Sequence, residues 1–324
     1  MYNALTDIPG FRVGHAQDLK GATGCTVVLC PPGTIGGADI RGSAAGTRQT
    51  DSLQSSHFVD EVHAVLLSGG SAFGLDASGG VMGYLEERSI GYQTSAGRVP
   101  IVPTAIIYDL GLGEKGVRPD REMGYQACLN SQSGKVEEGS VGVGTGATVG
   151  KLLGIQLATK GGVGTASISL PNGVVVAALV AVNAFGDVVD PQKRKIIAGA
   201  RDPENPDRFI DSASRIKGGT TLPRRDSGFQ NTTLGIVATN VKLSKRQTIK
   251  VAQMAQSGFV RSISPIHSTV DGDLIFALSA GDLQGDVNAV GLMAEEAVAA
   301  AVIRAIIAAD GLGFIPAYRD LPRD

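Results

Sequence analysis

Short runs of β-branched and apolar residues recur along the chain, and glycine, proline or asparagine bounds each of them. Such runs are typical of buried or half-buried strands. The turn sequence PNG at 171–173 separates two of the runs and predicts a hairpin. The predicted strands cover residues 25–30, 62–68, 101–108, 165–170, 174–183, 233–240 and 274–279.

Helical patterns lie between these runs. Residues 73–88 are rich in small side chains, which suits a helix packed closely on a sheet. Residues 244–259 have Ser244 as a candidate N-cap and Gly258 near the predicted end. Residues 287–311 predict a long alanine-rich helix that ends at a glycine. Strands, hairpins and helices in this mixture predict an α+β layered fold rather than strict β–α alternation.

Residues 191–230 depart from both patterns, because they are polar and proline-bearing. The sequence predicts a long loop here, and a loop of this length inside a domain is usually functional or mobile. It could also be a linker between two domains. The strands that follow it are too few to form a sheet alone, so they need partners from the first part. We therefore expect a single domain over 1–324.

Composition narrows the possible function classes. Of the 324 residues, 43% are hydrophobic and 19% are charged, which is enough for a large core. The net charge of −2 gives no basic footprint for nucleic acid. The apolar run 174–182 is too short to cross a bilayer, and no signal peptide precedes the first strand. We expect a cytoplasmic protein without a membrane or nucleic-acid partner.

Cysteine and histidine positions indicate no metal centre. The three cysteines (Cys25, Cys30 and Cys128) fit no ligand spacing and are expected to be buried reduced thiols. No two histidines have HxxxH spacing. The stretch GVGTGATVGK lacks the first glycine and the final Ser or Thr of a phosphate loop. We expect neither a cofactor nor a metal, while a Ser-His-Asp triad without a local signature stays open.

The chemistry-bearing feature is Asn231-Thr232-Thr233, at the start of a predicted strand. A threonine hydroxyl becomes a useful nucleophile when its residue is the first of a chain, because the free α-amine then serves as the base. The pKa of such an amine is about 7.7 to 8.0, close to working pH. Thr232 could reach this state if its hydroxyl attacked the Asn231 carbonyl and the ester were then hydrolysed. The alternative is an ordinary loop entering a strand.

A second constellation is HSTVDGDLIFA at 267–277. Asp271 and Asp273 stand two residues apart at the start of a predicted strand, so they are expected to share a face. Two carboxylates beside an amine could orient it and move protons. The alternative is a solvated D-G-D turn.

These two stretches together resemble the self-processing L-aminopeptidase/D-esterase peptidases, and within them the branch of the nylon oligomer (6-aminohexanoate-oligomer) endohydrolase. The resemblance extends in order over nearly the whole chain, through LTDIPGFRVGHA, GATGCTVVL, LLSGGSAFGLDASGGVMGYLEER, VPTAIIYDL, GVGTGATVGK and ALVAVNAFGDVVD. It implies a four-layer αββα sandwich like that of N-terminal-nucleophile hydrolases. It also implies autocleavage between 231 and 232 into a large chain, 1–231, and a small chain, 232–324.

The resemblance also implies roles for individual residues. Thr232 matches the nucleophile and Asn183 the asparagine that faces the oxyanion. Lys151 matches the lysine of the nylon hydrolase branch, and Tyr108 matches a tyrosine that could donate to the substrate carbonyl.

The acidic residues help to choose among the branches. Asp271 and Asp273 match the acidic pair of the nylon hydrolase branch, whereas the β-peptidyl and D-esterase branches carry Ser and Glu there. Threonine rather than serine as nucleophile favours the same branch. This chain lacks the longer N-terminal extension of the nylon hydrolase, and its 191–230 segment differs, so substrate choice stays open.

The function predicted is therefore hydrolysis of linear amides in short oligomers or peptides by an N-terminal threonine. The alternatives are an aminopeptidase, D-esterase or β-peptidyl aminopeptidase that acts on peptide N-termini, and an acyltransferase of the ornithine acetyltransferase type. A non-catalytic scaffold is a further alternative. The partners expected are a small amide or peptide substrate and further copies of the chain, as a tetramer of processed heterodimers.

Overall fold

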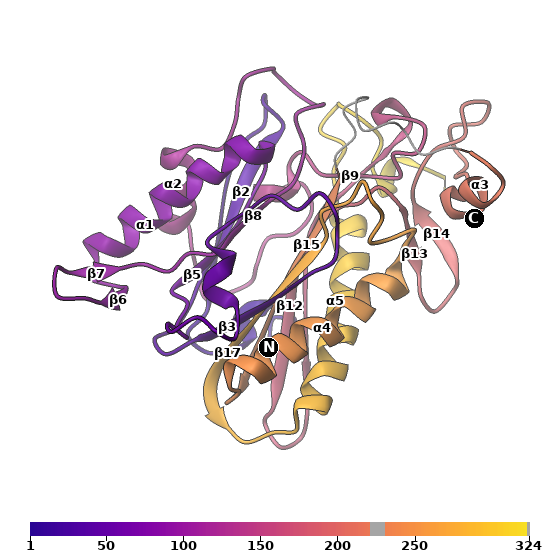
Figure 1. The fold of residues 1–324 in the computed structure, drawn as a ribbon. Helices are drawn as coiled ribbons and strands as arrows, with labels where there is room; N and C mark the ends of the chain where they lie inside the picture. Colours follow the sequence, from indigo (N-terminus) through magenta and orange to yellow (C-terminus); the bar gives the residue numbers. More distant parts are fainter. Residues whose placement is uncertain (221–230, 323–324) are drawn as a thin grey trace.

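Two five-stranded sheets lie face to face at the centre of the protein in the computed structural model, which describes residues 1–220 and 231–322 (Figure 1). The first sheet has the order β1-β2-β5-β8-β4 and the second the order β11-β12-β15-β17-β3. The strands of the first sheet are β1 (Arg12–Asp18), β2 (Thr23–Leu29), β4 (Thr47–Arg48), β5 (Ala64–Ser68) and β8 (Thr104–Ile106). Those of the second are β3 (Ile35–Ile40), β11 (Gly162–Ser169), β12 (Val175–Asn183), β15 (Thr232–Val241) and β17 (Leu274–Leu283).

Helices cover the outer face of each sheet (Figure 1). In this view α1 and α2 lie to the left of the strands, and α4 and α5 lie to the right. The α-helices are α1 (Ala77–Glu87), α2 (Arg121–Leu129), α3 (Ser212–Lys217), α4 (Lys245–Ser262) and α5 (Val287–Ala308). Short 3-10 turns are η1 (Leu5–Asp7), η2 (Thr50–Leu53), η3 (Ser71–Asp76), η4 (Gly142–Gly144), η5 (Ile155–Leu157) and η7 (Tyr318–Asp320).

Successive side chains of β12 point into two different hydrophobic cores, so this strand joins the layers. Ala177, Leu179 and Ala181 belong to the core between the two sheets, whereas Val180 and Val182 belong to the core under α4 and α5. A third core joins α1 and α2 to the outer face of the first sheet. The predicted αββα sandwich is therefore confirmed, and strand β12 is buried on both faces.

The connection from β15 through α4 to β17 brings the two predicted site segments together. β15 and β17 pair in parallel, and β12 pairs with β15 antiparallel in the register Asn183↔Thr232. Helix α4 begins at a capping box between Ser244 and Gln247, as the sequence predicted for Ser244. The expected end at 259 was wrong by three residues, since the helix continues to Ser262. A Cβ at Gly258 would lie 2.5 Å from the Glu295 carbonyl oxygen, so this glycine permits close packing of α4 on α5.

The segment expected to be a structureless loop at 191–230 is folded over its described part. It contains β14 (Lys195–Ala198) and α3, and β14 lies in a small sheet with β13 (Asp187–Asp190) and β16 (Ile263–Ser264). The remaining short strands are β6 (Tyr92–Gln93), β7 (Arg98–Val99), β9 (Thr148–Val149) and β10 (Thr159–Lys160). The last ten residues of the expected loop, 221–230, lie outside the described residues. No helix among the described residues is long and apolar enough to cross a membrane.

Candidate active site

Thr232 is the first residue of β15, and the peptide bond that precedes it is held from both sides. Its Oγ1 lies 2.5 Å from the Asn231 carbonyl oxygen, to which it donates. The same carbonyl oxygen accepts the Gly272 N–H at 2.8 Å, while the Asn231 N–H donates to the Val270 carbonyl at 3.2 Å. Asn231 and Thr232 are both buried. A side-chain hydroxyl and a backbone N–H therefore meet at one carbonyl oxygen inside the protein.

Asn183 lies opposite Thr232 on β12, and its side-chain amide is fixed by four contacts. The amide oxygen accepts from the Thr148 N–H at 3.0 Å, from the Thr148 hydroxyl at 3.4 Å and from Lys151 Nζ at 2.9 Å. The amide nitrogen donates to the Tyr108 carbonyl at 3.1 Å. An amide nitrogen carries two hydrogens, so one N–H remains for another acceptor. Asn183 is thus an oriented donor on the strand position that pairs with Thr232.

Lys151 reaches this asparagine from a buried position. Its Nζ also donates to the Asn183 carbonyl at 2.8 Å. Burial lowers the pKa of Lys151 to about 7, against the opposing charges of Asp271, Asp109 and Asp273. A buried ammonium whose neutral form is accessible near neutral pH is typical of functional sites.

Asp271 and Asp273 are fully buried, so the alternative of a solvated turn is wrong. The expectation that they open the strand is also wrong, because β17 begins at Leu274 and both residues precede it. Asp271 instead forms an isolated bridge with Asn231. Burial raises the pKa of Asp271 to about 7, and the negative charge of Asp273 adds to the rise while Lys151 opposes it.

The two carboxylates accept hydrogen bonds from three backbone N–H groups and one hydroxyl near Thr232. Asp273 accepts the Thr233 N–H at 2.7 Å, and its other oxygen accepts the His267 N–H at 2.9 Å. Asp271 accepts the Phe185 N–H at 3.1 Å and the Ser268 hydroxyl at 2.5 Å. Within the described residues, neither carboxylate hydrogen-bonds to Thr232 itself. Their contacts fix the backbone around the threonine.

Tyr108 is half-buried, and it joins the site through its backbone. Its carbonyl accepts from Asn183, while no hydrogen bond of its hydroxyl is present among the described residues. The predicted role of the hydroxyl as a donor to substrate therefore stays a prediction. The other six predicted residues, Thr232, Asn231, Asn183, Lys151, Asp271 and Asp273, are brought together by the contacts given above.

Two contributors were missed by sequence reasoning. Gly272 supplies the N–H at the Asn231 carbonyl, and a Cβ there would lie 2.8 Å from Thr232 Oγ1. His267 Nδ1 lies 3.3 Å from Asp273, in a residue with a φ of 57°. Both stood in HSTVDGDLIFA, but no pattern in the sequence distinguishes a backbone donor from a turn glycine.

Unpartnered buried atoms gather at the same place. Among the described residues, Asn231 Oδ1, Thr233 Oγ1 and His267 Nε2 are buried without a hydrogen-bond partner. Such atoms are rare in folded proteins and point to bound water, substrate or chemistry. No group of three or more His, Cys, Asp or Glu side chains suited to a metal exists within 1–220 and 231–322.

Asp187 anchors part of the segment that precedes Asn231 and Thr232. Its carboxylate accepts from the Ala200 N–H, the Ser212 N–H and the Ser212 hydroxyl at 2.8–2.9 Å, so it ties β13 to the start of α3. Burial raises the pKa of Asp187 to about 6 in spite of these donors. Between pH 3.8 and about 6, the Asp187 carboxyl is therefore mostly protonated in the folded protein and mostly ionised in the unfolded chain, where its pKa has the ordinary value of 3.8.

We expect the loss of unfolding free energy caused by Asp187→Asn to be smaller at high pH than at low pH. A raised carboxyl pKa means that the wild-type folded state loses stability as pH rises through about 4 to 6, whereas the neutral asparagine does not. The difference in unfolding free energy between wild type and variant should shrink by roughly 3 kcal/mol from pH 4 to pH 8. Urea unfolding of both proteins across this pH range measures the difference. A difference that grows with pH would contradict the argument.

Comparison with known sequences identifies the family of the chain. The profile of peptidase family S58 matches residues 3–315. An uncharacterized aminopeptidase of Mycobacterium leprae is 41% identical over 354 residues, covering 98% of this chain and 93% of the relative. A 6-aminohexanoate-oligomer endohydrolase of Agromyces sp. is 30% identical over 314 residues, covering 92% of this chain and 84% of the relative.

Solved structures share the fold at low sequence identity. The L-aminopeptidase D-Ala-esterase/amidase of Ochrobactrum anthropi, described as a variant among the Ntn hydrolase fold, has a TM-score of 0.70 at 21% identity and covers 95% of this chain and 87% of its own. A β-aminopeptidase of Burkholderia sp. has a TM-score of 0.70 at 20% identity, with 98% and 90% covered.

Proposed function

Because the chain belongs to peptidase family S58 and is an amide or peptide hydrolase, we propose that Thr232 is its nucleophile and that the chain cuts itself before this residue. The observation that carries the proposal is the approach of Thr232 Oγ1 to the Asn231 carbonyl, at 2.5 Å from its oxygen, in a buried site. The Gly272 N–H is placed to stabilise the oxyanion that forms on this carbonyl.

Self-cleavage proceeds as an exchange of one bond for another. Thr232 Oγ bonds to the Asn231 carbonyl carbon, the carbon–nitrogen bond breaks, and the hydroxyl proton ends on the released nitrogen. Water then hydrolyses the ester, which leaves a carboxylate at Asn231 and a free α-amine and hydroxyl at Thr232. Asp273 holds the Thr233 N–H throughout, so the new N-terminus stays in register with Asn183.

Hydrolysis of a substrate reuses the same hydroxyl. The α-amine of Thr232 takes the hydroxyl proton as the oxygen attacks a linear amide, and returns a proton to the leaving amine as the carbon–nitrogen bond breaks. Water then hydrolyses the acyl-enzyme ester, which releases the carboxylate product and restores the Thr232 hydroxyl. The remaining N–H of Asn183 donates to the developing oxyanion, and Lys151 keeps that amide oriented. Asp271 and Asp273 act mainly by position, since their oxygens hold backbone around the nucleophile.

The substrate class we propose is a linear amide in a short oligomer or peptide. The acidic pair and the threonine nucleophile favour the nylon oligomer hydrolase branch, and a relative at 30% identity carries the name of that activity. Aminopeptidase action on peptide N-termini is the second candidate, because a relative at 41% identity is named an aminopeptidase. Release of monomer or of internal fragments from a defined oligomer separates the two.

The experiment that tests self-cleavage is the intact mass of the purified protein under denaturing conditions. We expect two chains that separate between residues 231 and 232, and N-terminal sequencing of the smaller chain should read TTLGIVATN. One uncut chain in a sample that hydrolyses amides, or a cut at another bond, would refute the proposal.

A further inference from the structure

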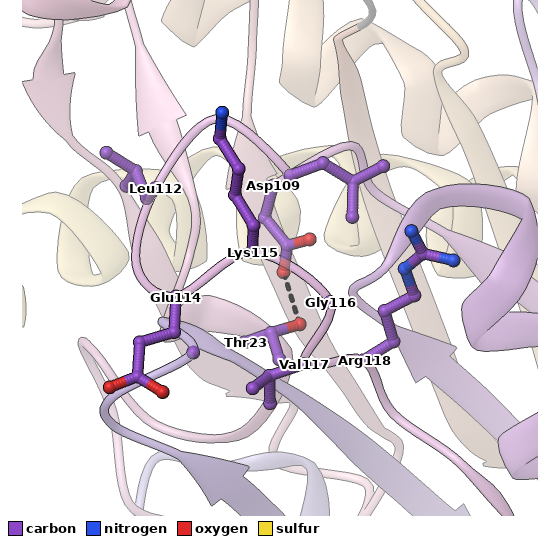
Figure 2. A pocket seen from close by; sticks show the side chains of 10 residues that line it. Thr23, Asp109, Leu112, Glu114, Lys115, Gly116, Val117 and Arg118 are labelled. Atoms are coloured by element: carbon purple, nitrogen blue, oxygen red, sulfur yellow. Dashed lines mark hydrogen bonds between the residues drawn. The ribbon is translucent and has the colours of Figure 1, made fainter.

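A separate cavity of about 200 Å³ lies where the residues after β8 return over the first sheet (Figure 2). Thr232 is not among its lining residues. At about 30 Å³ per water molecule, it has room for roughly six waters or one small organic molecule. It is lined by Gly21, Thr23, Asp109, Leu110, Leu112, Glu114, Lys115, Gly116, Val117 and Arg118.

The negative group of this cavity is Asp109, which is 2% exposed. Its two oxygens accept from the Thr23 hydroxyl and the Gly70 N–H, each at 2.7 Å. Gly69 and Gly146 pack so closely that a Cβ on either would lie 2.1 or 2.8 Å from Oδ2, so the carboxylate is rigidly held. A carboxylate can accept about four hydrogen bonds, and two of these positions are used here.

Asp109 lacks a counterion in contact. No salt bridge of the described residues includes it, although burial raises its pKa only to about 6 and leaves it ionised at neutral pH. The charge of the buried Lys160 lowers the pKa of Asp109, but Lys160 Nζ donates to the backbone carbonyls of Gly144 and Gly161 and not to this carboxylate. A buried carboxylate with accepting positions to spare and no cation in contact suits a ligand that brings a positive group.

The positive group of the cavity is Arg118. Its guanidinium lies 3.6 Å above the ring of Phe73, which holds it flat. Within the described residues it forms no hydrogen bond or ion pair, and its Nε is buried without a partner. Figure 2 draws Asp109 at the centre of the lining residues with the Arg118 side chain to one side.

The rest of the wall adds little net charge. Leu112 and Val117 offer an apolar surface, while Glu114 and Lys115 are exposed and of opposite sign. A simple cation would be repelled by Arg118, and a simple anion by Asp109. A molecule with both charges, joined by a short aliphatic stretch, satisfies both groups.

We propose that this cavity binds a small zwitterionic amino acid, with its ammonium group at Asp109 and its carboxylate at Arg118. Amino acids are also the products that amide hydrolysis of peptides or ω-amino oligomers releases, so the cavity would hold a product. That role rests on the proposed hydrolase function, whereas the binding site itself does not.

The cavity interacts electrostatically with the candidate active site. Asp109 directly follows Tyr108, whose carbonyl accepts from Asn183, and the charge of Asp109 raises the pKa of Lys151. An ammonium group bound at Asp109 would offset that charge. Occupation of the cavity would therefore lower the pKa of Lys151 and slow turnover as product accumulates.

Calorimetric titration of the full-length Thr232→Ala protein tests the proposal. The probes are glycine, 4-aminobutyrate and 6-aminohexanoate, together with hexylamine and hexanoate, which each lack one charged end. We expect saturable binding of at least one of the amino acids, and binding at least about tenfold weaker for the two singly charged probes. Asp109→Asn and Arg118→Gln should each weaken amino-acid binding by about tenfold or more.

Asp187→Asn is the matched control. Asp187 is also a buried carboxylate that accepts from a hydroxyl and backbone N–H groups, but it does not line this cavity. Its substitution should leave binding unchanged. Affinities weaker than about 10 mM for all three amino acids would overturn the proposal. Binding that survives Asp109→Asn, or that hexylamine matches, would overturn it as well.

The proposed function can fail without this site failing. The wild-type chain could prove neither cut nor hydrolytic while Thr232→Ala still binds an amino acid through Asp109 and Arg118. That result would support the binding site and contradict its role as a product site. If hydrolysis is found and none of the probes binds, the proposed function stands and the site falls.

Discussion

Replacing Thr232 with alanine should yield a single uncut chain of 324 residues with no amidase activity. One hydroxyl performs both self-cleavage and substrate attack in the proposed mechanism, so its removal abolishes both. Loss of a nucleophile typically lowers kcat by about 10⁴- to 10⁶-fold. Intact mass reports the cleavage, and release of amine from a linear oligoamide reports the hydrolysis.

The neighbouring hydroxyl provides the matched control for this substitution. Thr233 is buried beside Thr232, and its Oγ1 has no hydrogen-bond partner among the described residues. Thr233→Ala removes the same atoms one residue away, and it should leave cleavage at the same bond. Thr232→Ser keeps a hydroxyl and should still process. If Thr232→Ala retained amidase activity, or Thr233→Ala alone blocked cleavage, the nucleophile would have to be assigned elsewhere.

The layered fold could be predicted because the strands that carry it are strongly patterned. Residues 174–183 and 233–240 are continuous β-branched and small apolar runs, and both became central strands buried on two faces. The predicted hairpin at 171–173 is confirmed by the antiparallel pairing of β11 with β12. The order of strands in each sheet was not predictable from local patterns, because long-range pairing decides it.

The short elements of 191–220 were missed for a physical reason. The four residues of β14 and the six of α3 are too few to show a hydrophobic period. β14 is held by its pairing with β13, and the start of α3 by the buried carboxylate of Asp187, both from outside the segment. Polar sequence was therefore interpreted as loop, although tertiary hydrogen bonds give it a fixed place.

In the candidate site, the side chains that carry chemistry could be predicted from the sequence, whereas the backbone contributions could not. Thr232, Asp271 and Asp273 stood out because residue type and spacing suggested chemistry. Gly272 and the register of Asn183 opposite Thr232 depend on how three strands meet, which no local stretch contains. No role could be predicted for Asp109, which follows Tyr108, because its burial becomes apparent only in the folded chain.

Lys151→Met should lower kcat/KM by about 10² to 10³-fold and move the acidic limb of its pH profile to higher pH. The substitution removes the ammonium that orients the Asn183 amide, and loss of an oxyanion-side contact typically costs this much. The sign of the shift follows from charge. The positive charge of Lys151 lowers the pKa of Asp271, so without it that pKa rises and Asp271 stays protonated to higher pH. A free α-amine at Thr232 would likewise lose a nearby cation and stay protonated longer.

Lys160→Met separates this electrostatic role from mere loss of a buried lysine. Lys160 is also fully buried, burial lowers its pKa to about 7, and its Nζ donates to the backbone carbonyls of Gly144 and Gly161. It contacts neither Asn183 nor the Asp271 carboxylate. Its variant should lose stability without moving the acidic limb, when both proteins are measured after cleavage has been verified by mass. Equal shifts in the two variants, or an unshifted profile in Lys151→Met, would show that Lys151 only supports the fold, because a structural role changes the amount of active protein at every pH alike.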